Sequence, residues 1–213
     1  MLFLYLNCCM LSIMQAQTKT KYLIGVDEVG RGPLAGPVAV GAVLVSPRML
    51  KNFHDIKESK QLTSQQREEW VAEMQALRCD ELHIAVSMVH ASTIDRIGIV
   101  LAIRSALSRS LKKLEVVGSE CQVLLDGGLY APERFIHQRT IIGGDRAETV
   151  IAMASVAAKV HRDRYMVRLH KKYPVYNFDQ HKGYGTSGHM IALKTHGLSV
   201  VHRVSFCNFL KSS

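Results

Sequence analysis

The chain has 213 residues, and its 27 Lys and Arg against 18 Asp and Glu give it a formal net charge of +9 at pH 7. Its hydrophobic content of 47% excludes an intrinsically disordered protein, and its length indicates one domain, with room for a small appendage. The positive charge either serves solubility alone or attracts a polyanion such as a nucleic acid. Five cysteines, irregularly spaced, argue against a disulfide framework or a zinc site and favour a reducing, cytoplasmic location.

The first twenty residues differ from the rest of the chain. They are apolar, and no Lys or Arg precedes the apolar stretch, so they make a poor signal peptide. The stretch is also short and interrupted for a membrane span. We expect residues 1–20 to be a poorly ordered or mis-started tail, with Met10 or Met14 as the biological start. A membrane anchor is the minor alternative.

Strands and helices alternate along the remaining chain. Apolar runs bounded by glycine or polar residues predict a strand at 21–27 and its hairpin partner at 38–45. A helix follows at 63–77 with Thr63 as its N-cap, and then a strand at 82–89. Apolar spacing of three to four predicts one long helix at 92–114. Short strands at 122–126 and 139–142 precede a helix at 147–173, which Pro174 ends. This order is typical of an α/β sheet domain.

Two adjacent acids, Asp27 and Glu28, end the first apolar run, and the turn Gly30-Arg31-Gly32 follows them. Neighbouring residues on a regular strand point to opposite faces of the sheet. We therefore expect both acids to serve one site only if the strand stops at Asp27 and the glycine loop turns Glu28 back. The alternative is a strand end that carries two solvated acids.

Two more acids lie at or just beyond the ends of later apolar runs. Asp126 is followed by two glycines, and Asp145 is preceded by two. Sites in α/β sheets form beyond strand ends, where loops converge. Oxygen ligands without His or Cys suit hard cations such as Mg²⁺ or Mn²⁺, and a divalent ion removes the mutual repulsion of clustered acids.

Several short motifs between Tyr22 and Phe206 occur in the order of one known family. The chain resembles the type 2 ribonucleases H (ribonuclease HII). The matching segments are Asp27-Glu28-Val29-Gly30-Arg31-Gly32, Glu58-Ser59-Lys60-Gln61-Leu62, Asp126-Gly127, Gly144-Asp145, and residues 154–163, 181–186 and 202–206. Glu58 replaces the usual Asp, Val29 the usual Ala, and Gly128 stands where Asn is common. Arg31 favours type 2, because the type 3 family has Thr there.

The resemblance implies a ribonuclease H-like mixed β-sheet flanked by helices, with a small helical C-terminal part that carries Tyr184. Residues 21–213 would form the catalytic domain of a monomer without membrane association. The implied activity is metal-dependent hydrolysis of the RNA strand of RNA–DNA hybrids, and cleavage 5′ of ribonucleotides embedded in duplex DNA. The products would carry 5′-phosphate and 3′-hydroxyl ends. The alternative is a non-catalytic hybrid-binding protein of the same fold.

The resemblance also assigns the site residues. Asp27, Glu28, Asp126 and Asp145 would hold two Mn²⁺ or Mg²⁺ ions, the second arriving with the substrate. The loop of Gly30, Arg31 and Gly32 would read the 2′-hydroxyl, and Tyr184 would stack on the deoxyribose beyond the RNA–DNA junction. Further basic residues are either phosphate contacts or solvated surface charges, whereas His202 and Arg203 are interpreted as structural. The candidate phosphate contacts are Lys60, Lys159, Arg162 and Lys182.

Overall fold

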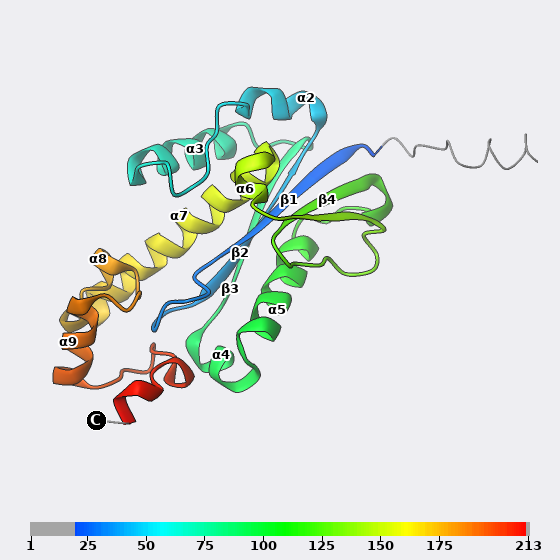
Figure 1. Cartoon of the computed structure of the whole chain (residues 1–213). Helices are drawn as coiled ribbons and strands as arrows, with labels where there is room; N and C mark the ends of the chain where they lie inside the picture. Colours follow the sequence, from blue (N-terminus) through cyan, green and yellow to red (C-terminus); the bar gives the residue numbers. More distant parts are fainter. Residues whose placement is uncertain (1–19, 212–213) are drawn as a thin grey trace, which may run out of the picture.

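The computed structural model describes residues 20–211, so the prediction of a poorly ordered tail at 1–20 lies outside the described residues except for Thr20. The described chain forms a five-stranded sheet flanked by helices on both faces (Figure 1), which confirms the predicted fold class. The strands are β1 (Tyr22–Val29), β2 (Val38–Val45), β3 (Leu82–Val89), β4 (Cys121–Asp126) and β5 (His137–Ile141).

The sheet is mixed, with the order β3-β2-β1-β4-β5. β1, β2 and β3 form an antiparallel meander, whereas β4 and β5 pair in parallel on the other side of β1. The predicted bounds of β2 and β3 are correct, because both are runs of apolar residues that the sheet buries on one or both faces. β1 is therefore the strand at which the two halves of the sheet meet.

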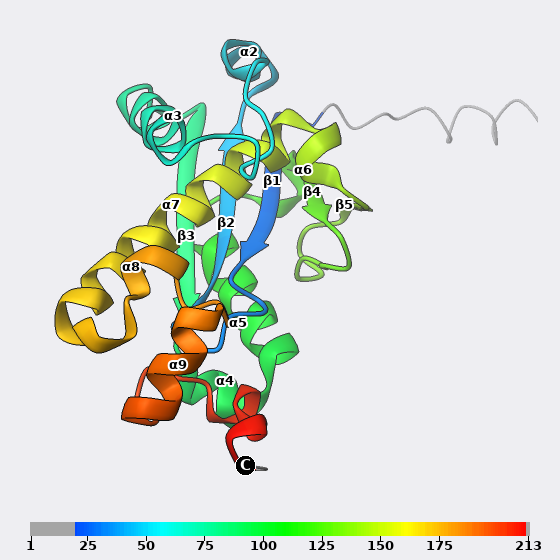
Figure 2. The same ribbon diagram turned by 60° about the vertical axis from the view of Figure 1, so that its left-hand side comes forward.

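Helices cover both faces of the sheet (Figure 2). On one face lie α3 (Ser64–Ala76) and the long α7 (Thr149–Lys172), and on the other lies α5 (Ile99–Lys112). The N-cap prediction for α3 is confirmed, because the Thr63 hydroxyl accepts from the backbone N–H of Gln66 in a capping box. The shorter elements are α2 (Pro47–Leu50), η1 (Lys51–Phe53), α4 (Ala91–Ile97), η2 (Gly118–Glu120) and α6 (Gly144–Ala147).

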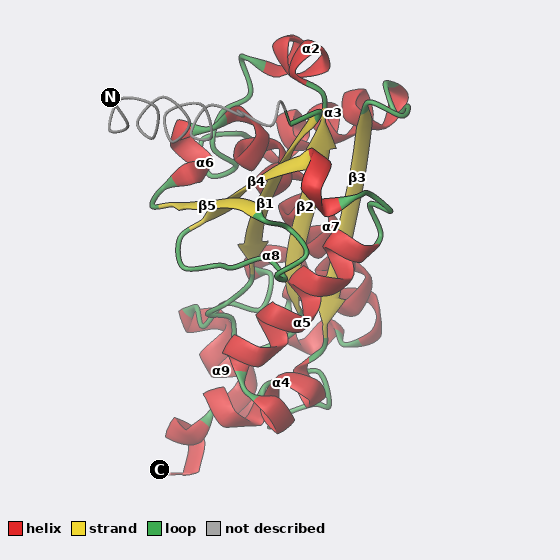
Figure 3. Cartoon of the chain, turned by 90° about the vertical axis from the view of Figure 1, so that its right-hand side faces the viewer, coloured by secondary structure: helices red, strands yellow, loops and turns green. Residues whose placement is uncertain are grey.

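A C-terminal module extends the molecule beyond the end of the sheet where α4 lies (Figure 3). Its elements are η3 (Pro174–Tyr176), α8 (Phe178–His181), α9 (Ser187–His196), η4 (Val204–Phe206) and η5 (Asn208–Lys211). It has an apolar core of its own, in which Met166 and Leu169 of α7 pack with Tyr176, Phe178 and Leu193. Helix α7 thus belongs to both the sheet domain and this module.

One ridge of α7 lies directly on glycine backbone. The ridge residues recur every four positions, so they form one row that winds slowly around the helix. They are Val150, Ala154, Ala158, Arg162 and Met166. A Cβ atom added to Gly25 would lie 1.9 Å from the carbonyl oxygen of Val150, and one added to Gly41 would lie 2.4 Å from that of Ala154. The absence of side chains on the sheet therefore sets how closely α7 approaches β1 and β2.

Three expected boundaries are wrong. The first strand continues to Val29 instead of stopping at Asp27, because β2 keeps pairing with it as far as Ala39. The helix predicted at 92–114 is two helices, because Gly98 adopts φ 80° and ψ 158° between α4 and α5. The helix predicted at 147–173 begins at Thr149, and Asp145 lies in the separate short helix α6.

None of the helices in residues 20–211 combines the length and the apolar character that crossing a bilayer requires.

Replacing Gly25 with Ala tests the packing of α7. We expect a loss of about 3 kcal/mol in the free energy of unfolding, since α7 must move away from β1 to accept the methyl group. In a chain of this length, that corresponds to a fall of roughly 6–12 °C in Tm. Gly188→Ala is the matched control, because nothing lies within 4 Å of a Cβ at that position. Equal melting temperatures for the two variants would contradict the tight packing.

Candidate active site

The first two acids lie where β1 loses one of its neighbours. Pairing of β1 with β4 ends at Val26 and Leu125, whereas pairing with β2 continues through Asp27 and Glu28. Beyond Val26, one edge of β1 is therefore open. Asp27 is buried at 7% exposure, and Asp126 is the last residue of β4. The end of β4 thus brings Asp126 beside the open edge of β1, although 99 residues separate the two aspartates.

The third segment reaches the site through the loop after β5. Gly143 adopts a left-handed conformation at φ 65°, and the chain then enters α6. The backbone N–H of Gly144 donates to Oδ1 of Asp126 at 2.7 Å. This hydrogen bond fixes the Asp126 carboxylate and places Asp145 next to it.

The four carboxylates act on one another. Burial, helped by the charges of Glu28 and Asp126, raises the pKa of Asp27 to about 7, although a hydrogen bond from Ser155 opposes the rise. Burial also raises the pKa of Glu28, and Arg31 partly offsets this. The pKa of Asp145 rises through burial and through the charges of Glu58 and Asp126. The structure therefore brings Asp27, Glu28, Asp126 and Asp145 into one electrostatic cluster, as the acids of a cation site would be.

The oxygen atoms of the four acids are suitable ligands for a hard divalent cation, but two of the side chains contact other groups of the protein. Glu28 Oε1 lies 3.5 Å from Nη1 of Arg31, and Oδ1 of Asp126 accepts from Gly144. Across residues 20–211, no three His, Cys, Asp or Glu side chains stand together in an arrangement that could hold a metal ion. A set of carboxylate oxygens nevertheless matches the ligand preference of Mg²⁺ and Mn²⁺. An ion bound at this cluster would compete with Arg31 for the Glu28 carboxylate.

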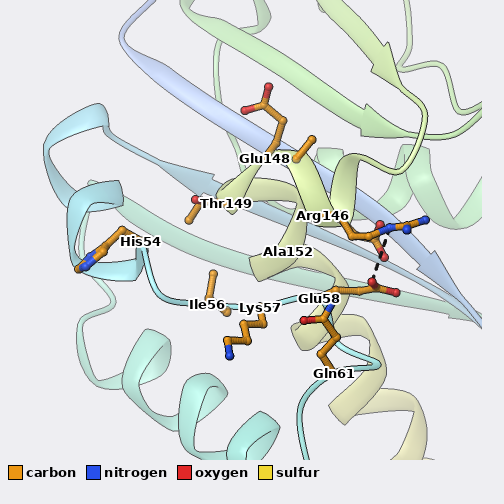
Figure 4. A pocket seen from close by; sticks show the side chains of 11 residues that line it. His54, Ile56, Lys57, Glu58, Gln61, Arg146, Glu148, Thr149 and Ala152 are labelled. Atoms are coloured by element: carbon orange, nitrogen blue, oxygen red, sulfur yellow. Dashed lines mark ion pairs between the residues drawn. The ribbon is translucent and has the colours of Figure 1, made fainter.

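A cavity of about 290 Å³ lies beside Asp145, between α6 and the segment that precedes α3 (Figure 4). Glu58, which replaces the family's usual Asp, points into this region and has only 10% of its side chain exposed. It pairs with Nζ of Lys60 at 3.5 Å and with Nε of Arg146 at 3.6 Å. Glu58 is therefore a fifth acid at the edge of the cluster, neutralised by two exposed cations.

Arg203 fastens the Gly30-Arg31-Gly32 loop, and Arg162 packs against Gly30 and fastens the segment that follows the loop. Arg203 donates to the carbonyl oxygens of Gly30 at 2.7 Å, Arg31 at 2.9 Å and Gly36 at 3.0 Å. Arg162 donates to the carbonyl of Pro37 at 2.9 Å, and a Cβ on Gly30 would lie 2.1 Å from its Nε. Both arginines are fully buried, and burial lowers their pKa values, that of Arg203 to about 9. The loop beside the acids is thus rigidly anchored.

The structure changes the interpretation of one basic residue, Arg162, and extends that of another, Arg203. Arg162, expected to contact phosphate, is at 0% exposure and donates to the backbone carbonyl of Pro37 instead. Sequence reasoning gave Arg203 a structural role but did not connect it with the loop, which lies 172 residues earlier at Arg31. Lys159 pairs with Asp163 at 2.9 Å, and Lys60 has 82% of its side chain exposed.

Tyr184 lies on the turn between α8 and α9 and is 41% exposed. The preceding Gly183, at φ 87°, accepts from the backbone N–H of Leu34 at 2.9 Å. The ring lies 5.8 Å from Cζ of Arg162. The C-terminal module therefore docks Tyr184 against the same segment that carries the Gly30-Arg31-Gly32 loop.

The buried charge of Asp27 makes a testable stability prediction. A group whose pKa is raised in the folded protein stabilises it below its ordinary pKa, and this contribution is lost as pH rises through the folded pKa of about 7. In EDTA at pH 8.5, Asp27→Asn should therefore raise Tm by several degrees, since a neutral amide keeps the oxygen that accepts from Glu28. At pH 5.5 the gain should shrink. The exposed Asp80→Asn is the control, and a gain independent of pH would contradict the assignment.

Comparison with known proteins gives consistent matches. The family model of ribonuclease HII matches residues 24–209. Ribonuclease HII of Caldicellulosiruptor bescii is 39% identical over 186 residues, which cover 87% of this chain and 86% of the relative. Ribonuclease HII of Syntrophobacter fumaroxidans is 42% identical over 85% of this chain and 75% of the relative.

Solved structures agree on the fold. The ribonuclease H2 from Pyrococcus horikoshii OT3 superimposes with a TM-score of 0.71 at 25% identity, over 89% of this chain and 96% of that protein. Bst-RNase HIII in complex with Mn²⁺ superimposes with a TM-score of 0.68 at 18% identity, over 92% of this chain and 70% of that protein, which shows the fold alone. With its matched family model, its relatives and its acidic cluster, the chain belongs to the ribonuclease HII family of endoribonucleases.

Proposed function

We propose that this chain is a metal-dependent endoribonuclease that hydrolyses the RNA strand of RNA–DNA hybrids and cuts 5′ of single ribonucleotides in duplex DNA. The observation that carries the proposal is the meeting of four mutually repelling carboxylates beside an arginine-anchored glycine loop. Membership of the family supports the hybrid substrate. The position-specific cut, with its 5′-phosphate and 3′-hydroxyl products, is the finer part of the proposal.

Asp27, Glu28, Asp126 and Asp145 would hold the divalent ions, Mn²⁺ or Mg²⁺, of which the second arrives with the substrate. When bound, such ions activate the attacking water and stabilise the leaving oxygen. The chain's own contribution is to keep the acids in a buried position where, without the ions, their charges are unfavourable. Ser155 and the backbone N–H of Glu28 hold the Asp27 carboxylate in place.

Substrate selection would come from the loop and from Tyr184. Arg203 hydrogen-bonds the carbonyls of Gly30 and Arg31, and Arg162 packs against Gly30, so the loop backbone would approach a ribose in one fixed shape. There the 2′-hydroxyl distinguishes RNA from DNA. The exposed ring of Tyr184 would stack on the deoxyribose beyond the junction. The net charge of +9 would attract the nucleic acid, with Lys60 among the phosphate contacts. Residues 21–213 would act as a monomeric catalytic domain in the cytoplasm.

The alternative is a hybrid-binding protein without catalysis. A protein that only bound hybrids would have no use for buried carboxylates, because their burial and mutual repulsion cost stability and contribute nothing to binding. The raised pKa of Asp27 therefore favours the catalytic assignment.

Removing the charge of Asp126 should abolish cleavage while leaving binding intact. In Asp126→Asn the amide oxygen still accepts from the N–H of Gly144, so the loop stays in place, but the ligand charge is lost. Loss of a ligand should reduce cleavage by more than about 100-fold, since even outer partners of a metal cost 10- to 100-fold. Cleavage of a duplex with one ribonucleotide, with Mg²⁺, Mn²⁺ or EDTA, measures this, and gel-shift titration measures binding. Cleavage by the parent in EDTA, or parent-like cleavage by the variant, would refute the metal assignment.

Substitutions at Tyr184 test the proposed preference for a single ribonucleotide embedded in DNA. Tyr184→Ala should reduce cleavage at a single embedded ribonucleotide by about 5- to 150-fold and should affect a long hybrid less, because stacking beyond the junction is then lost. Tyr184→Phe keeps the ring and should behave like the parent. Measured kcat/KM on both substrates, with Tm, separates this from a packing role, in which both activities would fall together with stability.

A further inference from the structure

A cluster of histidines in the C-terminal module lies next to Tyr184, whose backbone carbonyl is a hydrogen-bond partner of one of them. His189 is at 0% and His202 at 2% exposure, packed around the aromatic rings of Tyr176 and Phe178. The rings of His181 and His189 stack with their centroids 4.4 Å apart and their planes at 16°. Buried imidazoles at this density need a defined hydrogen-bond partner for each ring nitrogen.

The partners define one tautomer for each ring. The backbone N–H of Ser199 can only donate, so Nδ1 of His202, 2.9 Å away, accepts. The backbone carbonyl of Tyr184 can only accept, so Nδ1 of His189, also at 2.9 Å, donates. A neutral imidazole has one donor and one acceptor. The Nε2 atoms of His202 and His189, 3.1 Å apart, are therefore donor and acceptor respectively.

The hydrogen bonds form one directed chain. It runs from the N–H of Ser199 through His202 and His189 to the carbonyl of Tyr184. Both rings must be neutral, since a second proton on either would set two N–H groups against each other. Burial and the neighbouring His189 lower the pKa of His202 to about 4, which agrees with this. His181 closes the other side of the turn, because its Nδ1 accepts from the N–H of Gly183 and its Nε2 donates to the carbonyl of Tyr176.

The chain of hydrogen bonds ends on the carbonyl of Tyr184, the residue of this turn whose ring is proposed to face the substrate. The turn also docks on the segment next to the glycine loop, where a Cβ on Gly183 would lie 2.4 Å from the carbonyl oxygen of Ala35. His202 forms a β-bridge with the same Ala35. The two histidines thus link the position of the Tyr184 backbone to the segment that carries the Gly30-Arg31-Gly32 loop.

We propose that His189 and His202 are positioning residues that set the placement of the Tyr184 ring relative to the glycine loop, and thereby the preference for a ribonucleotide followed by DNA. The inference rests on the proposed role of Tyr184. An apolar core would support the turn but would not orient its backbone. Two imidazoles, each held in a single tautomer, fix the carbonyl of Tyr184 in one orientation.

Two substitutions at His189 distinguish the effect of its hydrogen bond to the Tyr184 carbonyl from the effect of its packing in the core. Asn places its amide N–H where Nδ1 of His stands, so His189→Asn keeps the donor to Tyr184. Gln places its amide group near Nε2, so His189→Gln keeps a partner for His202 and loses the donor to Tyr184. Both variants are polar and smaller than or similar to His, and each breaks one hydrogen bond of the relay.

The experiment measures kcat/KM of the parent, His189→Asn, His189→Gln and Tyr184→Ala on a single-ribonucleotide duplex and on a long hybrid, with Tm for each. His189→Gln should lower the ratio of the first activity to the second by about 2- to 10-fold, the range of one hydrogen bond. His189→Asn should retain the ratio. In a Tyr184→Ala background, His189→Gln should cause no further change in the ratio.

Equal ratios for His189→Asn and His189→Gln, or a fall of both activities in proportion to Tm, would overturn the inference. If Tyr184→Ala changes the ratio and His189→Gln does not, the inference alone fails; if Tyr184→Ala leaves the ratio unchanged, the proposed role of Tyr184 fails with it. Should His189→Gln not fold, His202→Asn and His202→Gln repeat the test. His202→Asn keeps the acceptor for Ser199 but removes the Nε2–H that holds the proton of His189 on Nδ1, so His189 no longer has to donate to Tyr184 and the ratio should fall. His202→Gln keeps an N–H near Nε2 and should not lower the ratio.

Discussion

The contact between one ridge of α7 and glycine backbone is the constraint on which the rest of the structure depends. Val150 and Ala154 lie on Gly25 and Gly41 of the sheet, so the helix axis is held close to β1. Asp27 lies buried next to this helix and hydrogen-bonds Ser155, and its burial raises the pKa of the carboxylate. A side chain on either glycine would lift the helix and open the site to water.

The same ridge continues beyond the sheet and places the other parts of the site. Arg162 fills the space that a side chain on Gly30 would occupy, and Met166 does the same at Gly36. Met166 also contacts Gly183 next to Tyr184 and belongs to the core of the C-terminal module. One rigid helix therefore sets the spacing between the acids, the glycine loop and the tyrosine turn.

Charge in this molecule is placed where it is costly. Asp27 lies buried beside two other acids, and Arg162 and Arg203 lie buried with backbone carbonyls as their partners. No carboxylate among the described residues forms an ion pair with either arginine. Hydrogen bonds to several carbonyls offset part of the desolvation of a guanidinium and hold the loop in one shape. Such unfavourable burial is typical of functional sites, where geometry takes precedence over stability.

The sequence by itself determined the strands at 38–45 and 82–89, the N-cap at Thr63 and the acids that cluster, because these depend on local patterns and on motifs. It did not determine the break at Gly98, since periodicity continues across a residue whose backbone turns. Nor did it show why Asp27 and Glu28 share a site on an unbroken strand; the open edge left where β4 ends decided that. The tertiary structure alone turned Arg162 inward and joined Arg203 to the loop at Arg31, because burial and contacts between distant residues arise only when the helices pack.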